Sequence, residues 1–268
     1  MKAHIRGAGV VGGFGCGMAA LEAAIRRQPE PPPAASDLSS GAPDVPALAA
    51  QTGLLDRLIP PRTLRRVDHY ARMALLASHL AIEDAHMGSG LPGTPGLVVA
   101  TGMGPTANTL DLQPVDATEA DLALSPILFS NSVQNAAAAY IAMLLKIQGP
   151  CLSISHYEMS VPLAFQTAID WLEEGRTETV LVGSVDCFSK ALHEAALSGR
   201  DSANADSIQG VAPVGEGSAF FILTRSETPG ARCPFVQHVH MGTASRSDAP
   251  PAPNTLVLHN SRNADFQG

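Results

Sequence analysis

Short apolar runs alternate along the chain with longer stretches in which apolar residues recur at the spacing of a helix. Runs of strand length span residues 3–11, 96–104, 151–155, 179–183 and 218–223, with weaker ones at 235–239 and 255–259. Helical spacing predicts helices at 18–27, 63–87, 161–172 and 191–197, and in an alanine-rich stretch that ends near residue 146. This alternation predicts a layered α/β fold.

Polar residues next to these stretches suggest where helices begin. Thr63 can cap the helix at 63–87, and Ser130 or Asn131 can cap the alanine-rich helix, because their side chains accept hydrogen bonds from free N–H groups. Residues 28–51 are rich in Pro, Ala, Ser and Gly, and residues 105–124 and 201–210 are polar. We expect these three segments to be loops.

The most informative turn lies within residues 149–172. A Gly-Pro pair precedes the run 151–155, which we expect to form a buried strand, and an amphipathic helix follows. Between them stand His156, Tyr157, Glu158 and Met159. A sharp turn from strand to helix directs its side chains and the first free N–H groups of the helix at one point, where many enzymes place a nucleophile or bind an anion. We therefore expect the functional site at this turn, around Glu158.

Composition narrows the class of protein. The 268 residues suffice for one large domain, and 45% hydrophobic but only 4% aromatic residues predict a core of Ala, Leu, Val and Ile. The formal net charge of −8 argues against a nucleic-acid partner. The four cysteines are isolated and the apolar runs are short. We therefore expect a cytoplasmic protein without a metal site, a cofactor or a membrane segment.

Two further motifs allow more than one interpretation. The glycine cluster at 12–17 could suggest a dinucleotide site, but the GxGxxG spacing and the acidic residue that should follow are missing, which favours a plain turn. Arg65, Arg66 and Arg72 could bind a phosphate. Three basic residues near Asp68 are, however, more often a solvated or ion-paired helix face.

Six segments together resemble the N-terminal half of a β-ketoacyl synthase of the thiolase-like superfamily. They are RRVDHYARMALLASHLAIEDA at 65–85, TGMG at 101–104, SPILFSNSVQNAAAAYIAM at 125–143, GP at 149–150, VLVGSVDCFS at 180–189 and GEGSAFFIL at 215–223. The resemblance implies a thiolase-like layered fold that is one half of the ketosynthase double repeat. It divides the chain into a ketosynthase N-terminal-like domain at 1–225 and a truncated remnant of the C-terminal half at 226–268.

The chain departs from this family at the residue that matters most. In active synthases the turn after the Gly-Pro strand carries a nucleophilic Cys, and the matching position here is Glu158. A carboxylate that attacked a thioester would form a mixed anhydride that water destroys, so condensation activity is not expected. Of the two histidines that the family takes from its C-terminal half, only His259 has a weak match, and no second candidate follows.

The resemblance supports one hypothesis above all, that of an inactive partner subunit. Such chains resemble the chain-length factors of type II polyketide systems, and by their shortness the small synthase-like subunits of aryl polyene clusters. They pair with an active synthase and shape its acyl pocket, while an acyl carrier protein takes part indirectly. The family's subunit interface would map onto a strand and onto small residues of the alanine-rich helix: Cys151, Leu152, Ser153, Ile154, Ser155, Asn135, Ala138 and Ala139.

Two other hypotheses stay open at this point. The chain could be a stand-alone thioester hydrolase or decarboxylase in which Glu158, with His259 or His156, is a general base. It could also be a structural stabiliser of a synthase without influence on product length. The sequence does not separate this last hypothesis from a pocket-shaping partner.

Overall fold

The computed structural model describes residues 2–27, 47–88, 90–111, 126–189, 214–225 and 234–239. Its centre is a seven-stranded mixed sheet in the order β2-β1-β8-β6-β4-β5, with β9 also paired to β1. The strands are β1 Ala3–Gly12, β2 Gly15–Cys16, β4 Gly96–Thr101, β5 Cys151–Ser155, β6 Thr179–Asp186, β8 Gly217–Thr224 and β9 Phe235–Val236. Strands β3 Ala47–Leu48 and β7 Val214–Gly215 form a separate parallel pair.

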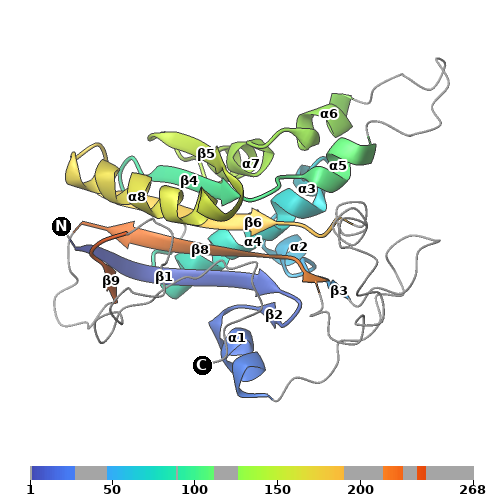
Figure 1. Cartoon of the computed structure of the whole chain (residues 1–268), viewed down its shortest axis with the longest axis horizontal. Helices are drawn as coiled ribbons and strands as arrows, with labels where there is room; N and C mark the ends of the chain where they lie inside the picture. Colours follow the sequence, from blue (N-terminus) through green and yellow to red (C-terminus); the bar gives the residue numbers. More distant parts are fainter. Residues whose placement is uncertain are drawn as a thin grey trace, which may run out of the picture.

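Helices cover both faces of this sheet, as the sequence predicts for a layered fold (Figure 1). The helices α4 His69–Asp84 and α7 Ala136–Leu144 pack on one face, and α8 Ser160–Glu173 packs on the other. The shorter helices are α1 Met18–Arg26, α2 Leu55–Leu58, α3 Pro61–Leu64, α5 Thr106–Asp111 and α6 Pro126–Ser132. None of the helices in the described residues is both long and apolar enough to span a membrane.

Two glycines of β1 let helix α4 lie unusually close to the sheet. A β-carbon at Gly7 would stand 2.3 Å from the carbonyl oxygen of Ala81, and one at Gly9 would stand 2.0 Å from that of Ala77. Both alanines belong to α4 and are fully buried. These glycines therefore serve strand-to-helix packing inside β1.

The predicted helix at 63–87 is two helices, and the predicted cap at Thr63 is wrong. Helix α4 begins only at His69, after Asp68 in an extended conformation. The carboxylate of Asp68 accepts a hydrogen bond of 3.1 Å from the backbone N–H of Ala71. This bond satisfies a free donor of the first turn, so Asp68 is the N-cap and the backbone turns before it.

The region before α7 also differs from the prediction. The expected loop at 105–124 contains helix α5, and residues 126–132 form α6. Asn131 lies inside α6, and the residue that precedes α7 is Asn135, whose side chain makes no capping hydrogen bond. The proposed caps Ser130 and Asn131 are therefore wrong. The loop predicted at 28–51 lies mostly outside the described residues, and the segments 191–197, 201–210 and 255–259, with His259, lie wholly outside them.

Candidate functional site

The ends of three parallel strands bring the informative turn next to two other segments. Strand β4 pairs in parallel with β5 and with β6, and the register sets Thr101 opposite Ser155 and Ala100 opposite Ser184. Because parallel strands end at the same edge of a sheet, the turn after β5, the TGMG turn after β4 and the end of β6 meet there. The sequence predicted the first of these three parts as the site.

Asp186, the last residue of β6, fixes the TGMG turn. Its carboxylate accepts hydrogen bonds from the Thr101 hydroxyl at 2.8 Å, from the Gly102 N–H at 2.9 Å and from the Met103 N–H at 3.0 Å. The Gly104 N–H donates in turn to the Thr101 hydroxyl at 2.7 Å. Successive backbone donors of this kind can bind an anion, but here the protein's own carboxylate already occupies them.

Ser160 ties the turn after β5 to the same place. Its buried hydroxyl donates to the Thr101 carbonyl at 2.7 Å and accepts from the His156 N–H at 2.8 Å. Between these two contacts Tyr157 has a φ of 45°, a left-handed conformation that costs a bulky residue roughly 1–2 kcal/mol. The turn is thus held in a strained shape by its neighbours, which is a common property of functional turns.

Glu158 does not sit in the buried setting that a general base would need. It lies in the short 3-10 helix η2 Tyr157–Met159, before α8 begins, and it is exposed, as is His156. The backbone donors nearest to this turn in the TGMG segment are already bonded to Asp186.

Strand β5 is an edge strand, and it is not buried, contrary to the prediction. It pairs with β4 on one side, and within the described residues no strand pairs with its other side. Cys151 and Leu152 are exposed, and only Ile154 packs against a core cluster, on the α8 side of the sheet. A short apolar run looks alike in a central strand and in an edge strand, and this explains the error.

A shallow hollow of about 340 Å³ lies along this free edge. Strand β5 supplies one wall, and α7 with its preceding residue supplies the other. The lining residues are Asn135, Ala138, Ala139, Cys151, Leu152 and Ser153. The structure therefore brings the two predicted interface segments together on one surface, although they are separate in the sequence. Ala138 is buried, whereas Ala139 is exposed, and its small side chain leaves the surface open to a close neighbour.

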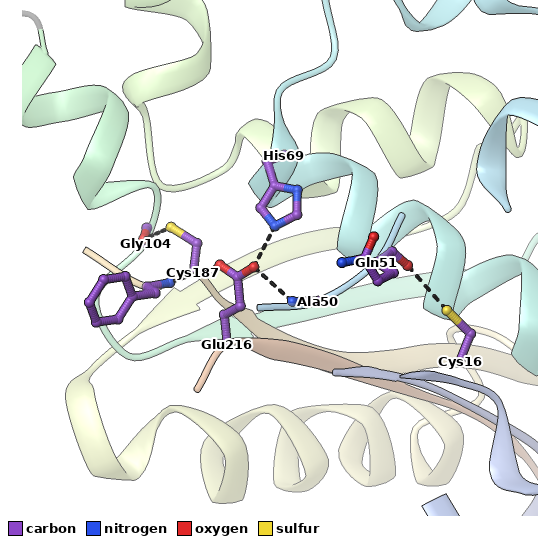
Figure 2. A network of polar contacts seen from close by, with 8 residues as sticks. Cys16, Ala50, Gln51, His69, Gly104, Cys187 and Glu216 are labelled. Atoms are coloured by element: carbon purple, nitrogen blue, oxygen red, sulfur yellow. Dashed lines mark hydrogen bonds and ion pairs between the residues drawn. The ribbon is translucent and has the colours of Figure 1, made fainter. Parts of the chain in front are cut away.

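A second polar cluster, which the sequence did not reveal, is centred on Glu216 (Figure 2). Its nearly buried carboxylate contacts His69 Nε2 at 2.6 Å and accepts from the Ala50 N–H at 3.0 Å and the Phe188 N–H at 3.1 Å. The bond with Glu216 raises the pKa of His69. Burial alone would raise the pKa of Glu216, but these hydrogen bonds hold it below its ordinary value. We call this cluster the Glu216 clasp.

None of the described cysteines has the lowered pKa of an acyl-transfer nucleophile. Burial raises the pKa of Cys187 to about 11, and its thiol faces the Gly104 carbonyl at 3.8 Å (Figure 2). Burial also raises the pKa of Cys16 and of Cys151. A nucleophilic cysteine needs a lowered pKa, so these thiols are unsuited to acyl transfer. Across the residues that the structure describes, no group of three or more His, Cys, Asp or Glu side chains is arranged to hold a metal.

The sheet, its two helical layers and the strand-to-helix turn define a ketosynthase-type half-domain, and comparison with known families agrees. The family of β-ketoacyl synthase N-terminal domains matches residues 55–228. This match covers more than half of the chain, so the protein belongs to the β-ketoacyl synthase family. A protein of Streptomyces virginiae described as a polyketide β-ketoacyl synthase 1 is 27% identical over 216 residues, which are 73% of this chain and 51% of the relative. The chain thus spans about half the length of this curated relative.

Solved structures with the same fold include ketosynthases bound to their chain length factors. The ishigamide ketosynthase/chain length factor superposes with a TM-score of 0.67 at 22% identity, over 87% of this chain and 64% of that chain. The ketosynthase ApeO in complex with its chain length factor ApeC from Xenorhabdus doucetiae gives 0.58 at 12% identity, over 84% of this chain and 80% of that chain. These likenesses confirm the predicted thiolase-like layered fold.

Proposed function

We propose that this protein is a catalytically inactive, chain-length-factor-like subunit that pairs with an active β-ketoacyl synthase. The observation that carries the proposal is the free, exposed edge of β5 beside the small residues Ala138 and Ala139. An unpaired edge strand is a template for another strand, and natural proteins usually protect such edges. A strand of the synthase that pairs with β5 would satisfy its free N–H and C=O groups and would fill the hollow.

The site supports an inactive role in three ways. By the sequence resemblance, Glu158 matches the position of the family's nucleophilic Cys, and its side chain is exposed. The backbone N–H groups of Gly102 and Met103 in the neighbouring TGMG turn are bonded to Asp186 and are not available to an oxyanion. The described thiols have raised pKa values. No feature of the described residues favours the alternative, a hydrolase or decarboxylase that uses Glu158 as a base.

The finer parts of the proposal concern the pathway. We assign the pair to type II polyketide or aryl polyene biosynthesis, or to a related fatty-acid-like pathway, in the cytoplasm. An acyl carrier protein would deliver substrate to the synthase and meet this subunit only indirectly. Residues 1–225 would form the ketosynthase N-terminal-like domain, and residues 226–268 would belong to the C-terminal half.

Co-purification with the synthase encoded beside this protein tests the proposal. We expect a stable heterodimer that Ala139→Trp, which fills the hollow from an exposed position of α7, and Leu152→Glu, which puts a charge on the exposed edge, both weaken at least tenfold. Ala23→Trp is the matched control, because Ala23 is exposed on α1. A wild-type chain that stays a stable monomer and does not bind the synthase encoded beside it would contradict the proposal.

The same preparation separates the enzymatic alternative. If the chain were a hydrolase or decarboxylase, the isolated protein would release free thiol from acyl or malonyl thioesters, and Glu158→Ala would abolish this release. In the partner role, Glu158→Ala should leave product formation by the pair almost unchanged. Thiol release by the isolated chain that depends on Glu158 would favour the alternative.

A further inference from the structure

The Glu216 clasp fastens two distant segments of the chain to the start of α4. Glu216 lies between β7 and β8, and 8% of its side chain is exposed. Its backbone N–H donates to the Leu48 carbonyl at 3.2 Å, and its carboxylate accepts from the Ala50 N–H at 3.0 Å. The same carboxylate accepts from the N–H of Phe188, two residues after the end of β6. One side chain therefore holds the residues after β3 and the residues after β6 in place.

His69 is the member of the clasp that meets solvent. Its side chain is 46% exposed, and its Nε2 atom lies 2.6 Å from the Glu216 carboxylate (Figure 2). His69 is the first residue of α4, where the helix dipole disfavours a positive charge. The bond with Glu216 nevertheless raises its pKa. This is expected, because hydrogen bonds between ionised groups are roughly twice as strong as those between neutral ones.

The charged groups that act on His69 together favour its protonated form. The bond with Glu216 has the largest effect, and the charge of Asp68 acts in the same direction, whereas burial and Arg72 lower the pKa of His69. Burial alone would raise the pKa of Glu216, but its hydrogen bonds hold it below the ordinary value. Glu216 therefore stays ionised near neutral pH. The charge state of the clasp then depends on His69.

The end of β6 places the clasp beside the candidate functional site. Asp186, the last residue of β6, fixes the TGMG turn, and Phe188 follows it by two residues. Between them, Cys187 has its thiol 3.8 Å from the carbonyl of Gly104, which belongs to the same turn. The clasp thus lies at the edge of the sheet that holds the candidate site.

We propose that the Glu216 clasp is a pH-sensitive connection, which is tight while His69 is protonated and opens more often when His69 loses its proton. Neutral His69 can still donate one hydrogen bond, but the attraction between opposite charges is lost. The Ala50 and Phe188 N–H groups should then reach solvent more often by local opening, while the rest of the chain stays folded. The inference concerns the chain alone and does not depend on the proposed partnership.

Amide hydrogen exchange of the wild-type chain tests this connection. The protection of Ala50 and Phe188, corrected for the intrinsic pH dependence of exchange, should fall roughly threefold or more between about pH 6 and about pH 8.5. The control is the N–H of Ala8, which is bonded to the carboxylate of Asp84 at the other end of α4. Its protection should change much less over the same range.

Two variants identify the titrating group. His69→Gln keeps a hydrogen-bond donor but cannot be charged, and it should fold because the ring is half exposed. Ala50 and Phe188 should then show, at every pH, the low protection of the wild type at high pH. His86→Asn is the matched control, because it removes an exposed histidine just after α4 and asparagine tolerates the φ of 52° at this position. This variant should behave as the wild type does.

Three results would overturn the proposal. The first is wild-type protection of Ala50 and Phe188 that does not change with pH. The second is an equal fall at Ala8, since the whole chain and not the clasp would then be opening. The third is a normal pH dependence in His69→Gln, because another group would then be responsible.

Discussion

Two histidines of α4 should make stability depend on pH in opposite directions, and His69 is the first. Its hydrogen bond with Glu216 raises its pKa above the ordinary 6.5, although burial opposes the shift. The folded state therefore holds this proton more tightly than the unfolded state does. The stabilisation is complete below about pH 6.5 and is lost as the pH rises through the raised pKa of the folded state.

His69→Gln should thus lower the free energy of unfolding most at about pH 6 and progressively less toward about pH 8.5. The largest loss should stay below about 2 kcal/mol, because the imidazole is half exposed and solvent screens its charge. Thermal or urea unfolding of both proteins across this range measures the difference. A loss that did not change with pH would argue against a charged Glu216 clasp.

His79 should produce the opposite dependence. Its Nε2 atom is buried without a hydrogen-bond partner in the described part of the chain, and burial lowers its pKa. The unfolded state then binds a proton that the folded state does not bind. Stability therefore falls as the pH drops below the ordinary histidine pKa of about 6.5. His79→Phe keeps a ring in place and removes the titration. Its unfolding free energy should fall less than that of the wild type between about pH 7 and about pH 5.

At the scale of single elements, the contact between β1 and α4 is the least tolerant of change. A β-carbon at Gly9 would lie 2.0 Å from the carbonyl oxygen of Ala77 and 2.4 Å from the N–H nitrogen of Ala81. Both neighbours are backbone atoms of a buried helix, so neither can rotate away. We expect Gly9→Ala to cost about 3 kcal/mol or more, at the upper end of overpacking effects.

Urea unfolding of Gly9→Ala measures this cost. Gly53→Ala serves as the control, because nothing lies within 4 Å of a β-carbon at that position. The control should change stability by less than about 0.5 kcal/mol, as surface substitutions usually do. Equal stability of Gly9→Ala and the wild type would mean that α4 can move away from the sheet.

Helices and strands could be predicted where a local sequence pattern determines them. The predictions failed where contacts with residues far away in the sequence determine the structure. The apolar runs predicted β1 and β8 to within one residue at each end, and they predicted the first residue of β4 and of β6 but missed the end of each by three residues. The local sequence suggests Asn131 as a helix cap. In the structure its side chain instead bonds with the Arg66 carbonyl and with Tyr140, and no local pattern predicts these two contacts. The bond between His69 and Glu216 joins residues 147 positions apart, and neither local sequence predicts it.

At the scale of the whole molecule, the two edges of the sheet differ in whether further strands cover them. At one edge, the ends of β1 are covered by β2, at Val11 and Gly12, and by β9, at Ala3 and His4. At the other edge, β5 has no covering strand within the described residues. The position of the free strand was predictable from the family resemblance, but its exposure was not. This asymmetry directs any strand-to-strand partner to β5.

If a strand of the synthase pairs with β5, the strained turn directly after β5 lies close to the synthase. A substitution in this turn therefore tests whether the subunit shapes the acyl pocket. Tyr157 is 62% exposed and has a φ of 45°. Tyr157→Gly removes a large ring and also relieves an unfavourable backbone conformation, so the isolated chain should be as stable as the wild type or slightly more stable. If the ring forms part of the pocket wall, its removal enlarges the pocket. The pair should then release longer products, at an unchanged affinity between subunits.

Chain-length analysis of the products made by the two pairs measures this effect, with Phe14→Leu, an exposed aromatic residue between β1 and β2 at the other end of the sheet order, as the control. An unchanged length distribution from an intact Tyr157→Gly pair would argue that the turn does not limit chain growth. The protein would then act as a structural stabiliser of its synthase, because pairing alone would account for the free edge strand. A shift toward longer products separates the two roles, since a stabiliser has no means of changing product length without changing assembly.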